Sequence, residues 1–178
     1  LGLEKPKVAI LAAVETVTSK MPATLDAAAL CKMAERGQIK GAILDGPLAF
    51  DNAISKDAAK TKGIDSDVAG DPDILLAPDL EAGNMLAKQL TFLARADSAG
   101  LVLGARVPII LTSRADSVRS RIASCAVAMR RASLYTRSAS SRPCQSISTR
   151  PRLFRAVAVV GWSPRLARAT LTPRRNTV

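Results

Sequence analysis

The segment from Asp71 to Lys88 constrains the fold more than any other part of the chain, because it joins an apolar run, a turn and a helix start. Residues 74–77 are apolar and predict a short buried strand, which Pro78 and Asp79 end. Asp79 is placed to cap a helix that continues through Asn84. In open α/β sheets such a turn lies at the carboxyl end of a strand, where ligands bind beside free helix N–H groups. A capped helix with nothing bound is the alternative interpretation.

The same alternation of apolar runs and helix signals continues on both sides of this segment. It predicts further strands at 7–14, 42–44, 101–103 and 108–111, and helices at 22–36 and after Asp116. Such alternation with short turns is typical of βαβ crossovers. We therefore expect an α/β fold with a mostly parallel sheet and flanking helices. About five strands, and a start directly on a strand, indicate a partial domain of a larger protein.

Two local predictions accompany these elements. Residues 45–47, Asp-Gly-Pro, predict a turn that ends the second strand. Asp116 is expected to cap the last helix. That helix carries Val118, Ile122, Cys125 and Met129 at helical spacing, i, i+4, i+7 and i+11.

Composition excludes several classes of function. Nearly half of the 178 residues are apolar and only 3% are aromatic, which predicts an aliphatic core. The three cysteines are far apart and the chain has no histidine, so a zinc site or a Ser-His or Cys-His pair is excluded. The sequence has no run of eighteen apolar residues and no secretory signal, and the odd cysteine count fits a reducing compartment. We expect a cytoplasmic location, and the missing initiating Met suggests a piece of a longer polypeptide.

Charge divides the chain into two parts. Residues 1–116 hold 13 basic and 15 acidic residues, a net charge of −2, whereas residues 117–178 hold 13 arginines and no acid. From residue 132 onward the chain is rich in Arg, Ser and Pro and has no periodic apolar face, which predicts a disordered basic tail at 132–178. All nine lysines precede residue 89, and such a switch from Lys to Arg is what a shifted reading frame of a GC-rich gene would produce.

Three motifs carry a resemblance to a known family. They are ILDGPLAFDNAIS at 43–55, DILLAPDLEAGNMLAKQL at 73–90 and GARVPIILTSRADSV at 104–118. With them, residues 1–131 resemble the C-terminal half of phosphate acetyl/butyryltransferases, in particular the acyltransferase part of bifunctional enoyl-CoA hydratase/phosphate acetyltransferases. The resemblance implies an isocitrate/isopropylmalate dehydrogenase-like fold, transfer of an acetyl or short acyl group between coenzyme A and phosphate, and a homo-oligomer. It implies no cofactor and no metal, because the coenzyme A thioester is a substrate.

The resemblance also implies site residues. The family's serine-arginine pair matches Ser113 and Arg114, where a hydroxyl and a guanidinium could stabilise negative charge on the reacting groups. Related enzymes place an acid seven positions after this serine, but Ser120 stands there, so Asp116 is the nearby candidate for the proton acceptor or, equally, a helix cap. Substrate-binding candidates matched by the motifs are Asp45, Gly46, Asp51 and Asn84, of which the two aspartates could instead serve turns and caps.

The sequence offers three alternatives to acyl transfer. The arginine-rich tail would bind nucleic acid non-specifically, although it has no RNP motif or zinc finger. Dehydrogenases of related fold need metal ligands and a Gly-rich dinucleotide motif, and neither occurs here. Synthesis of fatty-acyl phosphate would need a longer apolar pocket, which a sequence cannot show. Because half of the family's domain is missing, the chain alone is expected to be weakly active or inactive.

Overall fold

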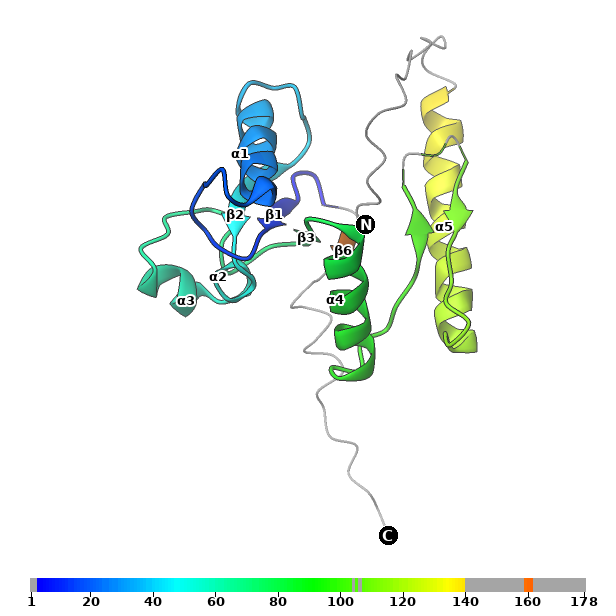
Figure 1. Cartoon of the computed structure of the whole chain (residues 1–178). Helices are drawn as coiled ribbons and strands as arrows, with labels where there is room; N and C mark the ends of the chain where they lie inside the picture. The colour runs from blue at the N-terminus through cyan, green and yellow to red at the C-terminus, as the bar shows by residue number, and fades with distance from the viewer. Residues whose placement is uncertain (1–2, 104, 106, 140–158, 162–178) are drawn as a thin grey trace, which may run out of the picture. The chain divides into compact units, whose positions relative to one another are not determined.

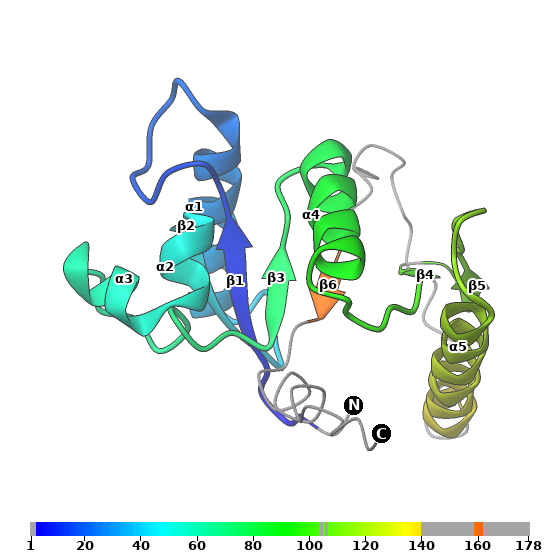
Figure 2. The same cartoon turned by 90° about the horizontal axis from the view of Figure 1, so that it is seen from below.

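The computed structural model describes residues 3–103, 105, 107–139 and 159–161. The described residues divide into two compact units, one formed by residues up to 88 with 159–161 and the other by residues from 89 to 139. Figures 1 and 2 show the elements of each unit.

The first unit is built on a sheet in the order β2-β1-β3-β6. Strands β1 (Lys7–Leu11), β2 (Ile43–Leu48) and β3 (Ile74–Leu76) are parallel, and β6 (Val159–Gly161) pairs antiparallel with β3. Central strand β1 is buried at its carboxyl end because its residues Ala9, Ile10 and Leu11 are small or aliphatic. The predicted α/β class with a parallel sheet and flanking helices is confirmed for this unit.

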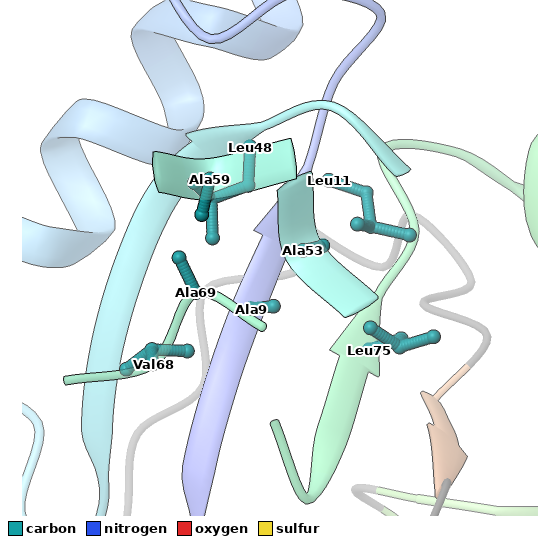
Figure 3. Packing of buried hydrophobic residues seen from close by; sticks show 8 residues of the cluster. All are labelled: Ala9, Leu11, Leu48, Ala53, Ala59, Val68, Ala69 and Leu75. Carbon is teal, nitrogen blue, oxygen red and sulfur yellow. The ribbon is translucent and has the colours of Figure 1, made fainter. Parts of the chain in front are cut away.

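Helices and one loop complete the core on the sheet. Helices α2 (Phe50–Ile54) and α3 (Lys56–Thr61) contribute Ala53 and Ala59, which pack with Leu48 and Leu75 (Figure 3). The cluster is aliphatic throughout, as the low aromatic content predicts, and its other buried members are Ala9, Leu11, Val68 and Ala69. Small alanines let the helices approach the strands closely.

Two longer helices follow the first and third strands. Helix α1 (Pro22–Glu35) begins with proline, whose fixed φ suits a first turn. Gly37, just beyond its end, has a φ of +71°, a conformation that glycine adopts readily because it has no Cβ. Helix α4 (Leu80–Phe92) follows β3, as the central segment of the sequence predicts. Asp79 Oδ1 accepts a hydrogen bond from the Ala82 N–H at 2.7 Å, which confirms the predicted cap.

The prediction of a turn at residues 45–47 is wrong, because β2 continues through them to Leu48. Ala9 pairs with Asp45 and Leu11 with Leu48, so that Gly46 and Pro47 together lie opposite Ile10 in a bulge. A Cβ on Gly46 would lie 2.7 Å from the Ile10 carbonyl oxygen. Pairing with β1 therefore keeps this Asp-Gly-Pro sequence in the strand.

The second unit contains a hairpin and a long helix. Strands β4 (Leu101–Val102) and β5 (Ile109–Ile110) are antiparallel, so these two predicted strands do not extend the parallel sheet. Helix α5 (Val118–Ala139) follows. Ser124, which is 1% exposed, accepts a hydrogen bond from the Gly100 N–H at 3.0 Å and so joins the helix to the hairpin.

The periodic apolar residues of α5 are exposed in the described part of the chain. Val118, Ile122 and Met129 are 73%, 64% and 68% exposed, and Cys125 is exposed as well. The buried residues are Ser124 and Ala128, because the hairpin approaches the side of the helix that carries small residues. Periodicity predicted the helix but does not identify the side that packs against the hairpin.

The basic tail at 132–178 lies largely outside the described residues. Helix α5 continues to Ala139, past the compositional break at residue 132, and β6 begins within the apolar stretch of sequence at 156–160. Disorder of 140–158 and 162–178 stays a prediction. Within the described residues no helix is long and apolar enough to cross a membrane.

Candidate active site

The first candidate group lies on β2, beside α1. Asp45 Oδ1 accepts a hydrogen bond from the Gly46 N–H at 2.8 Å, and the Cys31 thiol of α1 donates to the Gly46 carbonyl at 3.5 Å. Burial and the nearby negative charge of Asp45 raise the pKa of the Cys31 thiol to about 11, against a smaller opposing effect of the Gly46 bond. The thiol is therefore protonated at neutral pH and is a poor nucleophile. Asp45 and Gly46 are thus brought together with Cys31.

Asp51 belongs to a different group, the Glu15 cluster, which consists of Glu15, Asp51, Asn52 and Lys62. The Lys62 ammonium lies 3.0 Å from Asp51 Oδ2 and 3.3 Å from Glu15 Oε2. The hydrogen bond from Lys62, with backbone N–H donors, lowers the pKa of Asp51. The same bond and the Glu15 carboxylate raise the pKa of Lys62. Both groups are therefore charged at neutral pH.

Asn52 is the buried member of the Glu15 cluster. Its side chain is fully buried, and its Nδ2 donates to Glu15 Oε2 at 3.3 Å. Its Oδ1 is buried and has no hydrogen-bond partner among the described residues. Sequence reasoning did not select Glu15, Asn52 or Lys62. The available signal was the position of Glu15 directly after the first predicted strand, the place where open α/β sheets bind ligands.

Asn84 stands apart from both groups. It lies in α4 and is exposed, one turn beyond the Asp79 cap. Of the four substrate-binding candidates, the structure therefore pairs Asp45 with Gly46, places Asp51 in the Glu15 cluster and leaves Asn84 on a helix surface.

The catalytic candidates lie in the second unit, in the loop between β5 and α5. Asp116 Oδ2 accepts a hydrogen bond from the Ser113 N–H at 2.7 Å, and the Asp116 N–H donates to the Ser113 carbonyl at 3.1 Å. These two bonds close a turn that brings Ser113 and Asp116 together. Asp116 does not cap α5, contrary to the prediction. The cap is Ser117, whose Oγ accepts from the Ser120 N–H at 3.1 Å, because it directly precedes the first helical residue.

Arg114 lies in the same turn and is exposed. Its carbonyl accepts a hydrogen bond from Arg121 Nη2 at 3.3 Å. No ion pair or hydrogen bond of its own guanidinium is seen within the described part of the chain, so the group is accessible to an anion. Planar guanidinium groups bind phosphate and carboxylate through paired N–H donors.

Ser120, which replaces the acid of related enzymes, is bonded to other serines. Its hydroxyl lies 3.2 Å from Ser98 Oγ and 3.1 Å from Ser117 Oγ. A serine hydroxyl does not accept a proton at neutral pH as a carboxylate does. Within the described residues there is also no cluster of three or more His, Cys, Asp or Glu side chains that could hold a metal ion.

Comparison with known proteins identifies the family of these motifs. The model of the phosphate acetyl/butaryl transferase family matches residues 1–129. Phosphate acetyltransferase of Rhizobium meliloti is 74% identical over 128 residues, 72% of this chain and 40% of the relative. Phosphate butyryltransferase of Clostridium acetobutylicum is 50% identical over 128 residues, 72% of this chain and 42% of the relative.

A solved structure supports the same assignment. The crystal structure of a branched-chain phosphotransacylase from Enterococcus faecalis V583 is similar with a TM-score of 0.63 and 39% identity, over 72% of this chain and 46% of that one. The chain thus spans less than half the length of these relatives. With the family model covering more than two thirds of its residues, this chain belongs to the phosphate acetyl/butaryl transferase family.

Proposed function

We propose that this chain is part of a phosphate acyltransferase that moves an acetyl or other short acyl group between coenzyme A and inorganic phosphate. The observation that carries the proposal is the family match over residues 1–129, which includes the exposed Ser113–Arg114 turn. Relatives named for acetyl and for butyryl transfer both resemble it, so the acyl chain is stated only as short. Its substrates are an acyl-CoA and phosphate, and the chain itself supplies no cofactor.

The chemistry assigns roles to the turn residues. When the thiol of coenzyme A attacks an acyl phosphate, negative charge develops on the carbonyl oxygen and then on the departing phosphate. The Arg114 guanidinium and the Ser113 hydroxyl would stabilise this charge. A well-placed donor at such a position accelerates a reaction about 100- to 1,000-fold. Asp45, Gly46, Asp51 and Asn84 would contribute to binding the acyl phosphate, with Asp51 held by Lys62.

The remaining features follow from family membership. We propose that the complete protein has the isocitrate/isopropylmalate dehydrogenase-like fold, forms a homo-oligomer and acts in the cytoplasm. Because this chain covers 40% of its relative from R. meliloti, we expect it to show little or no activity alone.

A chimera tests the proposed function. Residues 1–129 would replace the matched segment of the R. meliloti phosphate acetyltransferase, and release of free thiol from acetyl-CoA would be measured with and without phosphate. We expect phosphate-dependent activity, and a loss in kcat of about 100-fold or more on Arg114→Ala. The matched control is Arg119→Ala, which removes an arginine with an 80% exposed side chain that pairs with Asp97. A folded but inactive chimera would contradict the function, whereas an unaffected Arg114→Ala chimera would contradict only the site.

A further inference from the structure

The second unit leaves apolar side chains uncovered along one side of α5. Val118, Ile122 and Met129 are 73%, 64% and 68% exposed, and Cys125 is exposed as well. Their helical spacing places these four residues, here called the α5 stripe, on one side of the helix. Ser124, which bonds to the hairpin, lies on another side. Because a contiguous apolar patch on a protein surface marks a contact with another surface, the stripe needs an occupant.

Strand β5 has the same property on both of its faces. Ile109 and Ile110 are neighbours in the strand, so their side chains point to opposite faces of the hairpin, and they are 45% and 42% exposed. Apolar residues on both faces are typical of strands inside an α/β sheet that is covered on each side. A two-stranded sheet is too small to be stable as such a layer alone. The hairpin therefore has the composition of an inner part of a larger sheet.

The α5 stripe ends where the family match ends. Met129 is its last member, and the family model matches residues 1–129. The next positions at the same spacing are 132, 133 and 136, and they carry alanine, serine and threonine. The stripe is thus confined to the part of α5 that is shared with the relatives. Its occupant should therefore be something that the relatives also have.

The length of the relatives identifies this occupant. The chain covers 40% of the R. meliloti phosphate acetyltransferase and 46% of the E. faecalis phosphotransacylase. More than half of each relative therefore has no counterpart in this chain. In a complete protein that part is joined to the second unit covalently, which favours contact within one polypeptide over contact with a second copy.

We infer that the α5 stripe and the uncovered hairpin form a docking surface for the part of the complete protein that has no counterpart in this chain. The contact is apolar on the side of the stripe and is a continuation of the sheet on the side of the hairpin. The inference rests on family membership and on exposed side chains of one unit. It does not depend on the reaction that the complete protein catalyses.

Cys125 reports directly whether the stripe is covered. Iodoacetamide labelling of Cys125 is compared, at one pH, between the full 178-residue chain and the chimera of the preceding section. We expect labelling to be about tenfold slower or more in the chimera, because a covered thiol reacts only when the contact opens. Both proteins unfolded in urea should label Cys125 equally, which controls for the reactivity of the thiol itself.

A pair of glutamine variants measures the contribution of the stripe to stability. Ile122→Gln places an amide in the stripe, and Arg119→Gln places the same residue on α5 outside it, at a side chain that is 80% exposed. Neither variant should change the Tm of the full chain, where Ile122 is exposed. In the chimera, Ile122→Gln should lower the Tm by about 4 °C or more, since the amide would be buried without a partner, and Arg119→Gln should not.

A further measurement needs no chimera. The tagged full chain is co-expressed with the unmatched part of the R. meliloti enzyme, which it should capture. The Ile122→Gln chain should capture much less of that part than the Arg119→Gln chain. Equal capture by the two variants, or none by the parent chain, would contradict the inference.

The labelling experiment also distinguishes other occupants. Equal labelling of Cys125 in the full chain and in a folded chimera would overturn the inference. Protection that is lost on dilution would identify a second copy as the occupant, and protection of the full chain on adding vesicles of anionic lipid would identify a membrane surface; each would overturn it too. A chimera that is folded and protected but inactive would support the docking surface and count only against the proposed function.

Discussion

Replacement of Gly46 by alanine should destabilise the first unit, because β1 leaves no space for a side chain there. An added Cβ would lie 2.7 Å from the Ile10 carbonyl oxygen, 2.8 Å from Ile10 Cβ and 3.3 Å from Ile10 Cα. Ordinary contacts of a Cβ begin near 3.4 Å, and two of these three atoms belong to backbone in the central strand. The strands would have to separate by several tenths of an ångström. Overpacking of this kind costs about 1–3 kcal/mol.

Thermal unfolding of the full chain measures the effect by far-ultraviolet circular dichroism. For a unit of this size, about 2 kcal/mol corresponds to a fall in Tm of about 8–16 °C. The matched control is Gly41→Ala, where φ is +86° and no atom lies within 4 Å of the added Cβ. That variant has only the backbone cost of a left-handed residue, about 1 kcal/mol. A Gly46→Ala chain that melts with the parent, or above Gly41→Ala, would refute the steric reasoning.

Two further predictions concern buried polar groups. Ser124→Ala removes the acceptor of the Gly100 N–H and should destabilise the second unit by about 1–3 kcal/mol, seen as faster amide exchange at Gly100. Ser19→Ala, at an exposed serine, is the control. Unchanged exchange at Gly100 would contradict the prediction. Cys31 should react with iodoacetamide more slowly than exposed Cys125 at pH 8, and about tenfold faster per pH unit up to pH 10, because only its thiolate reacts. Because the pKa of Cys31 is higher in the folded chain, the thiol stabilises the fold below pH 9, and this contribution is lost as the pH rises to about 11. Equal labelling of Cys31 and Cys125 at pH 8, measured by peptide mass spectrometry, would disprove the burial of Cys31.

Local patterns predicted the parallel sheet and its helices well. The apolar runs before residue 80 are short and end in turn or cap residues, so β1, β3 and α4 could be located from sequence, with Asp79 as the cap. These features depend on neighbours within a few residues, which a sequence displays directly.

Features set by distant neighbours were not predictable. Asp45-Gly46-Pro47 is a turn sequence by composition, and only pairing with Ile10 keeps it in β2. The exposed apolar face of α5 follows from which side meets the hairpin, and amphipathic periodicity does not identify a partner. The Glu15 cluster joins residues up to 47 positions apart, so no local motif marks it.

The small hairpin of the second unit has a consequence for heat inactivation. Each of its strands contributes two residues, and Ser124 supplies its described polar link to α5. Two-stranded sheets of this size are marginal alone, and local opening requires far less free energy than global unfolding. The turn with Ser113 and Arg114 connects these two elements, so its geometry lasts only while they stay joined. On warming, the turn would therefore lose its geometry while most of the helix content is still intact, and brief cooling would restore it.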